Sequence, residues 1–382
     1  MPECFSKTIS SLWSRRLNLS LRLGRRRRYD EKQIRMKEFR TPAGGEEEHV
    51  RKYGLTFAAW FEKYTFILIP GSLVLGWLLS DHLIAYVGWI PYLFGYITLV
   101  MALGCGVRHL RDVMKRPLAV ILTLLIAHAA APLLAYGLGA AVFGPQSDYT
   151  IGLLLFAIIP LGISSVMWVG TSGGSVPFIL ALVVLDTMLS PIVVPTLMGA
   201  FFSNAAMDWD AKGLMVDLLQ MVVLPTLVGV LLYECSKGKI KAWSAPVAQP
   251  ISKVFFMLVV LLNAASIAPH AAGMKQEMMI VIPAVILLIM ICYALGYFGA
   301  YAVRKPSREL QITVTYASGM RNISLGMVLA TAYFSPQASI PVVLGIMFQQ
   351  PAATLIHAWW SRRRNKGGRA EQEGAWKRRI SS

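Results

Sequence analysis

Apolar side chains fall in ten runs of about twenty residues along this chain, and short polar breaks separate the runs. A helix of about twenty residues spans the hydrocarbon core of a bilayer, because each residue adds about 1.5 Å along its axis. The pattern therefore predicts an all-α, polytopic membrane protein with ten transmembrane helices. The helices are expected at residues 61–79, 84–106, 118–143, 149–172, 176–202, 214–233, 254–269, 278–303, 310–334 and 340–360.

Composition supports this class of protein. Of the 382 residues, 55% are apolar and 15% are charged, and the mean hydropathy is +0.55. Charged residues make up about 25% of an ordinary soluble domain, so a soluble, disordered or disulfide-rich chain is excluded. The four cysteines are Cys4, Cys105, Cys235 and Cys292, and none of them forms a C-x-x-C pair. Neighbouring cysteines therefore cannot build a zinc knuckle or a redox dithiol. We expect no metal site and no cofactor, and Na⁺ stays open as a bound ion.

The net charge of +17 lies mostly in two tails. Residues 1–63 carry fifteen Lys and Arg against eight Asp and Glu, and residues 362–382 carry eight against two. Basic segments beside a hydrophobic domain indicate contact with anionic lipid rather than nucleic acid. We expect a basic tail without a fold at 1–60, a transmembrane domain at 61–361 and a basic cytoplasmic tail at 362–382.

The loops give an independent test of the ten spans. With the N-terminus inside, the inner loops hold eleven basic residues and the outer loops hold two. The inner residues are Arg108, Arg111, Lys115, Arg116, Lys237, Lys239, Lys241, Lys253, Arg304, Lys305 and Arg308, and the outer ones are Lys212 and Lys275. This bias predicts that both termini are cytoplasmic. We expect the bacterial inner membrane; the Arg-rich residues 1–28 resemble a transit peptide, so an organellar membrane is the alternative.

Two charged residues, Asp186 and Arg321, fall near the centres of expected spans, and His128 is the third deep group that titrates. A charge in a bilayer costs at least about 2.5–3.5 kcal/mol on insertion scales, so each one needs a reason. Asp186 and Arg321 can form a structural ion pair. Alternatively, Arg321 binds an anionic substrate and Asp186 carries a proton. His128 is either a hydrogen-bonded packing residue or part of the coupling group.

Two spans should be broken near mid-depth. The fourth contains Pro160 and Gly162 followed by Ser164 and Ser165, and the ninth contains the run Ser318, Gly319, Met320, Arg321 and Asn322. Non-helical backbone at membrane depth is tolerated where protein covers it or where it lines a wet cavity. Broken helices also offer their ends to ions and charged substrates. Two breaks therefore predict a shared internal site.

The broken span is the fourth of five in residues 61–202 and again in residues 214–361. Since each half has an odd number of spans, the second half must be inverted relative to the first. The sequence predicts two inverted five-helix repeats.

Three stretches, 111–132, 159–195 and 314–350, carry a resemblance to a known family in their order and spacing, including Gly319-Met320, Asn322 and Gln349. The chain resembles the bile acid:sodium symporter superfamily over residues 64–360. The resemblance implies a panel of spans one, two, six and seven beside a core formed by the other six. It also implies that the broken spans four and nine cross in the core, and that transport occurs by alternating access.

The chain departs from the sodium-coupled members at the expected ion sites. Those members have Ser-Asn at the fourth-span break and a Glu-x-Gly-Met-Gln-Asn run in the ninth span. Here Val166 follows Ser165, Ala317 replaces the carboxylate, and Arg321 occupies the glutamine position. The fifth-span hydroxyl positions align with Ile179 and Val183. Because a guanidinium repels Na⁺ and can replace its charge, classical sodium coupling is not expected.

The leading hypothesis is a secondary carrier of an organic anion, either bile-acid-like or a small carboxylate. The substrate-binding candidates are Ser164, Ser165, Ser318, Arg321 and Asn322, with Arg321 binding a carboxylate in bidentate fashion. Asp186 is the proton carrier or the group that releases Arg321.

Other functions fit the same sequence. The alternatives are a transport-inactive sensor, a symporter with rebuilt sodium sites and an arsenite exporter. An enzyme is not expected, since the six histidines show no metal-ligand spacing.

Overall fold

The computed structural model describes residues 45–202, 210–271, 275–303 and 306–380, and these residues form helices without a strand. The chain divides into two units, Met1–Tyr53 and Gly54–Ser382, and every contact discussed below lies within the second. The unfolded basic tail predicted at 1–60 lies outside the described residues as far as residue 44. Helix α2 begins at Gly45, before the expected first span.

Seven of the described helical segments are long and apolar enough to cross a membrane: Ser80–Ala102, Pro117–Phe143, Val176–Phe202, Ala211–Cys235, Lys239–Pro269, Glu277–Ala302 and Pro336–Arg363. Three shorter apolar helical segments are Ile67–Leu78, Asp148–Ile158 and Ile323–Tyr333. The polytopic helical class is therefore confirmed.

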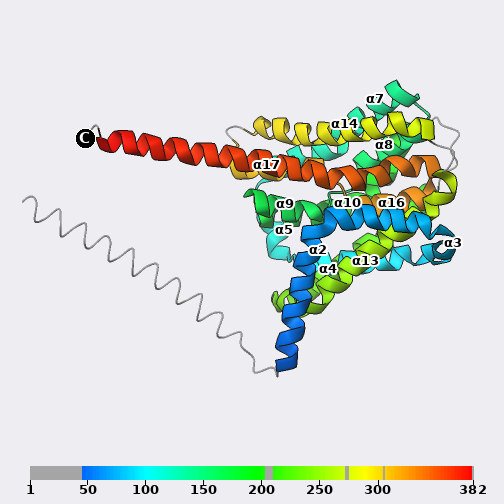
Figure 1. The fold of residues 1–382 in the computed structure, drawn as a ribbon, viewed down its shortest axis with the longest axis horizontal. Helices are drawn as coiled ribbons and strands as arrows, with labels where there is room; N and C mark the ends of the chain where they lie inside the picture. The colour runs from blue at the N-terminus through cyan, green and yellow to red at the C-terminus, as the bar shows by residue number, and fades with distance from the viewer. Residues whose placement is uncertain (1–44, 203–209, 272–274, 304–305, 381–382) are drawn as a thin grey trace, which may run out of the picture. The chain divides into compact units, whose positions relative to one another are not determined.

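The individual helices follow the chain in this order (Figure 1): α2 (Gly45–Leu78), α3 (Ser80–Leu83), η1 (Ile84–Trp89), α4 (Ile90–Ala102), α5 (Val107–Met114), α6 (Pro117–Leu125), η2 (Ile126–Ala130), α7 (Ala131–Phe143), α8 (Asp148–Ile158), α9 (Ser164–Ser172), α10 (Val176–Phe202), α11 (Ala211–Leu218), η3 (Leu219–Val223), α12 (Leu224–Cys235), α13 (Lys239–Ala271), α14 (Lys275–Gly299), η4 (Ala300–Ala302), α15 (Arg308–Gly319), α16 (Ile323–Tyr333) and α17 (Pro336–Ile380).

Two interruptions fall where the sequence predicts them. Helix α8 ends at Ile158 and α9 begins at Ser164, so Pro160 and Gly162 lie between them. Helix α15 ends at Gly319 and α16 begins at Ile323. Proline removes a backbone donor, so the first helix cannot continue with full hydrogen bonding.

Two further segments, η2 and η3, are π-helical turns within longer helices. Each is followed after one residue by a proline, Pro132 and Pro225. A π-turn inserts a residue into the helix, which changes which carbonyl each N–H reaches. The sequence analysis did not predict these turns.

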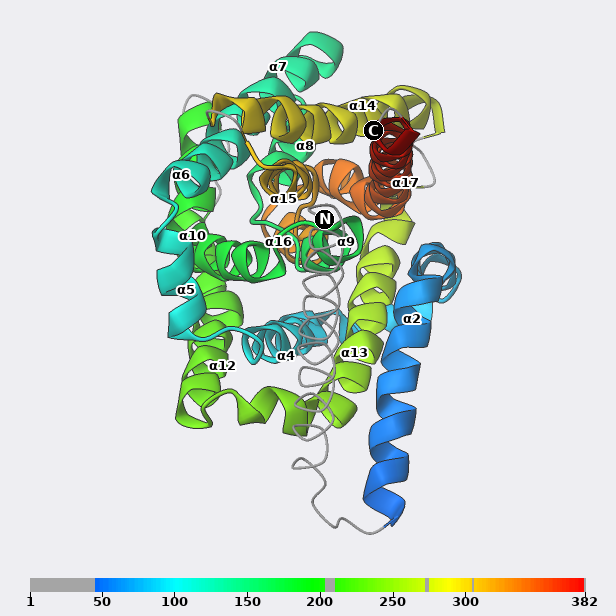
Figure 2. The same cartoon turned by 90° about the vertical axis from the view of Figure 1, so that its left-hand side faces the viewer.

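The helices pack as two groups, named here the panel and the core. The panel holds α2, α3, α4, α12 and α13, together with α11, which continues through η3 into α12 and also packs on α10. The core holds α6–α10 and α14–α17. Within the panel α4 packs on α12 and α13, and within the core α8 packs on α7 and α17 and α14 packs on α15. Figure 2 shows α4, α12 and α13 in the lower half, α8, α14 and α15 in the upper half, and α9 and α16 between them.

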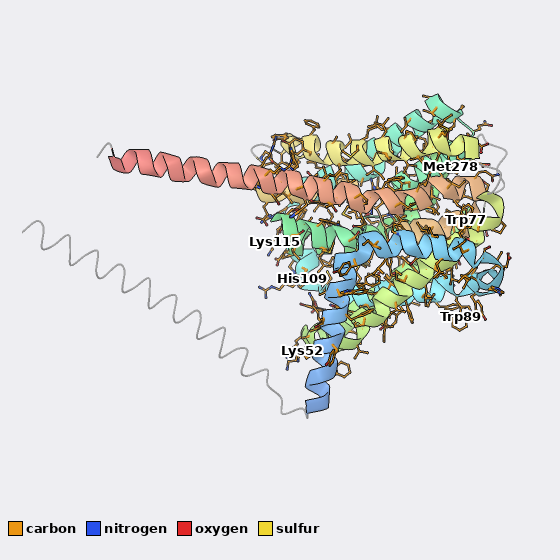
Figure 3. The ribbon with its side chains drawn as sticks, in the orientation of Figure 1. Lys52, Trp77, Trp89, His109, Lys115 and Met278 are labelled. Carbon is orange, nitrogen blue, oxygen red and sulfur yellow. The ribbon has the colours of Figure 1, made fainter. Side chains whose placement is uncertain are left out.

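The two ends of the helices differ in composition. Figure 3 shows Trp77, Trp89 and Met278 at one end, and His109 and Lys115 at the other. Helix α13 extends to the basic end and begins at Lys239, whereas the sequence analysis placed the start of this span at residue 254. The two lysines Lys241 and Lys253, predicted in a loop, therefore lie on a helix.

Gly162 tests the packing at the first interruption. A Cβ atom at this position would lie 2.6 Å from the Arg321 carbonyl oxygen and 2.9 Å from its carbon, and this backbone cannot move aside cheaply. Gly162→Ala is expected to destabilise the fold by about 1–3 kcal/mol, measured as a lower melting temperature of the purified protein. The matched control is Gly137→Ala in α7, where a Cβ meets nothing within 4 Å. Equal melting temperatures for the two variants would contradict the close approach.

Candidate functional site

The two interrupted segments meet and satisfy each other's backbone. Leu161 and Arg321 form an antiparallel bridge between them. The Gly162 N–H donates to the Met320 carbonyl at 2.9 Å, and the Asn322 N–H donates to the Pro160 carbonyl at 2.7 Å. Both bonds join residues far apart in sequence, so the breaks form one joint, which we call the crossing.

Side chains from two other helices complete the crossing. The Leu161 N–H donates to Asp186 Oδ2 of α10 at 2.7 Å. Gln349 of α17 pairs with both backbone groups of Arg321: its Oε1 accepts from the Arg321 N–H at 2.8 Å, and its Nε2 donates to the Arg321 carbonyl at 3.2 Å. The Gln349 amide thus acts as a neighbouring strand would, and it pairs both the N–H and the carbonyl of Arg321.

The Arg321 side chain extends away from the crossing toward η2. Its exposure is 1%, and Nη2 donates to the Ala127 carbonyl at 3.1 Å. That carbonyl is available because the Ala131 N–H bonds instead to Ile126, five residues back, and the next residue, Pro132, has no N–H. The π-turn and its proline therefore create an acceptor for the buried guanidinium.

Asp186 pairs with His128 and not with Arg321. His128 Nε2 lies in hydrogen-bond contact with Asp186 Oδ1, and Asp186 is 1% exposed. No salt bridge joins Asp186 to Arg321, although the structure describes both side chains. The direct ion pair between Asp186 and Arg321, one of the two sequence interpretations, is therefore wrong for this structure. The arginine contacts the Ala127 carbonyl, while the histidine occupies the carboxylate.

Several buried polar atoms near the crossing have no hydrogen-bond partner in the described part of the chain. They include Arg321 Nε, Arg321 Nη1 and His128 Nδ1, and also the hydroxyls of Thr187, Tyr293 and Ser318. The free guanidinium nitrogens are donors. A guanidinium with free donors favours an anion or water beside it and disfavours a cation.

A cavity of about 510 Å³ separates the panel from the core at the crossing. Its core side includes Gly162, Ile163, Ser164, Val166, Arg321, Asn322, Ser324 and Gln349, and its panel side includes Phe94, Ile97, Met101, Lys241, Gln249, Ser252, Lys253 and Phe256. A volume between about 300 and 1,000 Å³ is typical of small-molecule sites. The cavity is therefore large enough for a drug-sized substrate.

The predicted substrate residues divide into two sets. Ser164, Arg321 and Asn322 line the cavity, although the Arg321 guanidinium itself points to η2. Ser165 is fully buried and its hydroxyl donates to the Gly162 carbonyl at 2.6 Å. Ser318 is fully buried and packs against Gly296 of α14, where an added Cβ atom would lie 2.8 Å from the Ser318 Cβ. In this conformation neither Ser165 nor Ser318 lines the cavity.

Positive charge in the cavity comes from Lys241 and Lys253, which the sequence analysis treated as loop residues. Lys253 is half-buried and Lys241 is exposed. Both lie on α13, where the polar residues Ser244, Gln249 and Ser252 share the cavity face. Burial raises the pKa of the nearby Cys105 thiol to about 11, so this thiol is neutral and adds no negative charge beside Lys241. The sequence feature that could have predicted this face is the spacing of the polar residues before residue 254, which fall on one face of a helix.

Comparison with known proteins identifies the class. The family model "Sodium Bile acid symporter family" matches residues 91–271. The Bacillus subtilis protein YbaS is 33% identical over 290 residues, which cover 76% of this chain and 94% of YbaS. The sodium-dependent transporter YocS of the same organism is 23% identical, covering 82% and 93%. The probable chloroplastic sodium/metabolite cotransporter BASS2 of Oryza sativa is 25% identical, covering 78% and 71%.

A helical membrane protein with this cavity and these relatives is a membrane transporter. The chain belongs to the sodium bile acid symporter family. The family consists of transporters and not of enzymes.

The Asp186 carboxylate should stabilise the crossing measurably. Asp186→Ala leaves the buried Leu161 N–H unpaired, which costs about 1–3 kcal/mol, whereas Asp186→Asn keeps an acceptor. We expect the melting temperature to fall more for Asp186→Ala than for Asp186→Asn.

Asp112→Ala is the matched control. Lys115 donates to Asp112 at 2.7 Å and lowers the pKa of this carboxyl, but both side chains are more than half exposed and their pairing is worth little. If this variant melts as low as Asp186→Ala, the buried hydrogen bond is not the cause.

Proposed function

We propose that this protein is a secondary carrier of an amphipathic organic anion that works by alternating access without Na⁺. The observation that carries the proposal is the cavity between the panel and the core, which reaches the crossing and is lined by apolar walls and two lysines. Relative motion of the panel and the core would expose such a cavity to each side in turn.

Chemistry of the cavity favours an amphipathic anion. Phe94, Ile97, Met101 and Phe256 supply an apolar wall. Lys241 and Lys253 supply positive charge, and the Ser164 hydroxyl and the Asn322 amide can hydrogen-bond an oxygen of the substrate. A ligand with an apolar body and one acidic group can pack on the apolar wall and pair its charge with the lysines.

The residues at the crossing do not fit a Na⁺ ion. Both oxygens of Asp186 already accept hydrogen bonds, one in the contact with His128 and one from the Leu161 N–H. The unpartnered guanidinium nitrogens of Arg321 at this place are donors. Hard cations require oxygen ligands, and a buried guanidinium repels them. Arg321 therefore supplies a fixed positive charge where a sodium ion would otherwise be needed.

The His128–Asp186 pair is the group proposed to carry a coupled proton. With Arg321 charged, Asp186 ionised and His128 neutral, the three side chains sum to zero charge; adding a proton to the pair makes the sum positive. A substrate anion and the proton therefore favour each other's binding. His128 Nδ1 has no hydrogen-bond partner among the described residues, and this nitrogen can bind or release the transferred proton.

The proposal also includes ten membrane spans in two inverted five-helix repeats. The seven long helices account for seven membrane spans, and α2, the α8–α9 pair and the α15–α16 pair account for the other three. The basic end marked by His109 and Lys115 is proposed to face the cytoplasm, with both termini on that side and the basic tails on anionic lipid. For a bacterial chain this membrane is the inner membrane.

Transport into proteoliposomes tests the proposal. Taurocholate, whose sulfonate stays ionised, and pyruvate serve as large and small anions. We expect an acidic exterior to drive taurocholate uptake in the absence of Na⁺, and Asp186→Asn to abolish the response to the pH gradient. Uptake that needs Na⁺ would contradict the fixed-charge role of Arg321, and pyruvate uptake without taurocholate uptake would contradict the amphipathic substrate.

Lysine substitutions test the anion-binding face separately. Lys253→Gln removes a half-buried charge from the cavity, so taurocholate binding should weaken about tenfold, because a hydrogen bond to a charged group is worth about 1.5–3 kcal/mol. Lys241→Gln should have a smaller effect because this lysine is exposed. The readout is the thermal stabilisation of the purified protein against taurocholate concentration. Lys115→Gln, outside the cavity, is the control; if it weakens binding as much as Lys253→Gln, the cavity lysines are not specific.

A further inference from the structure

At one end of the cavity, the panel and the core are in direct contact. Val328 of α16 packs in one buried cluster with Ile90 and Leu93 of α4 and with Val259 and Leu262 of α13. The cavity therefore reaches the exposed Lys241 in one direction and is closed by this apolar cluster in the other.

One strong polar contact joins α16 to a panel helix beyond this cluster. The Tyr333 hydroxyl donates to Asp217 Oδ2 of α11 at 2.5 Å, and both side chains are half-buried. A second, weaker contact joins α16 to another panel helix, from the Thr331 hydroxyl to Asn263 Oδ1 of α13 at 3.4 Å. The Tyr333–Asp217 bond is short and charge-assisted, which makes it the stronger of the two.

Helix α16 links this bond to the substrate cavity. Its first residues, Ile323 and Ser324, line the cavity beside the crossing, and its last residue is Tyr333. Eleven residues extend about 15 Å along a helix. Movement of the crossing relative to the panel therefore acts directly on the Tyr333 hydroxyl.

We propose that Tyr333 and Asp217 form a latch that holds the cavity closed toward the face opposite Lys241, and that this hydrogen bond breaks in each transport cycle. The inference rests on the proposed alternating access. Tyr333 and Asp217 are positioning residues, since neither lines the cavity. Breaking the latch should shift the conformational equilibrium toward opening at the far face by about tenfold, the effect expected for a charge-assisted hydrogen bond.

Site-directed labelling tests the latch without any substrate. The reporter is Ser164→Cys in the cavity, in a background where Cys4 and the exposed Cys235 are replaced by serine; Cys105 and Cys292 are buried. A membrane-impermeant maleimide is applied to membrane vesicles of either orientation. In the otherwise unchanged protein, we expect labelling from the Lys241 side and slow labelling from the far side.

Tyr333→Phe and Asp217→Asn should each raise the far-side labelling rate about tenfold, and the double variant should not exceed either single variant, because both remove the same bond. Tyr301→Phe is the matched control: it removes a hydroxyl on an exposed tyrosine of η4 that contacts Tyr297 at 3.2 Å.

Unchanged far-side labelling in both latch variants would overturn the proposal. Equal increases from both sides, or an increase in Tyr301→Phe, would also overturn it, since these results indicate general loosening. If one latch variant fails to fold, the other carries the test. Because labelling needs no transported anion, a wrong substrate class would leave this result unaffected.

Discussion

Backbone hydrogen bonding at membrane depth is the constraint on which this structure depends. Where α8 and α15 stop, the peptide groups lose their helical partners, and an unpaired group in hydrocarbon costs several kcal/mol. The structure solves this by placing the two interruptions against each other, so that Gly162, Met320, Pro160 and Asn322 pair. Side chains of Asp186 and Gln349 then close the two outer edges. The joint is consequently assembled from four separate membrane segments.

A charged side chain at that depth is accommodated by the same logic. Arg321 is fully buried but is not neutralised by direct contact with a carboxylate. Its guanidinium contacts a carbonyl that a proline has left without its own donor, and the carboxylate of Asp186 is held by His128. Two groups of opposite charge therefore lie near each other without forming a direct salt bridge.

The sequence predicted the helical class and the two helix interruptions, because proline, glycine and hydroxyl residues within an apolar run are strong local signals. It predicted Asp186, His128 and Arg321 as the deep polar groups, since charge in an apolar run is conspicuous. It could not predict which of them pair, because that depends on a π-turn and on how α10 and η2 are rotated. Lys253 was misplaced for another reason: the polar stretch before residue 254 continues as helix α13, and only tertiary packing turns it toward the cavity.

The Ala127 carbonyl has no backbone partner within its own helix, and this has a consequence for the order in which the helices enter the membrane. Ala127, Asp186 and the Pro160–Gly162 segment all precede Arg321 in the chain, so they are synthesised and inserted first. Until α15 and α16 are inserted, the segment between α8 and α9 lacks its hydrogen-bond partners in the crossing. Arg321 then enters a membrane that already holds the Ala127 carbonyl as a hydrogen-bond acceptor, which lowers the cost of inserting its charge. The early spans are thus left incomplete in the bilayer, and the late, charged span completes them.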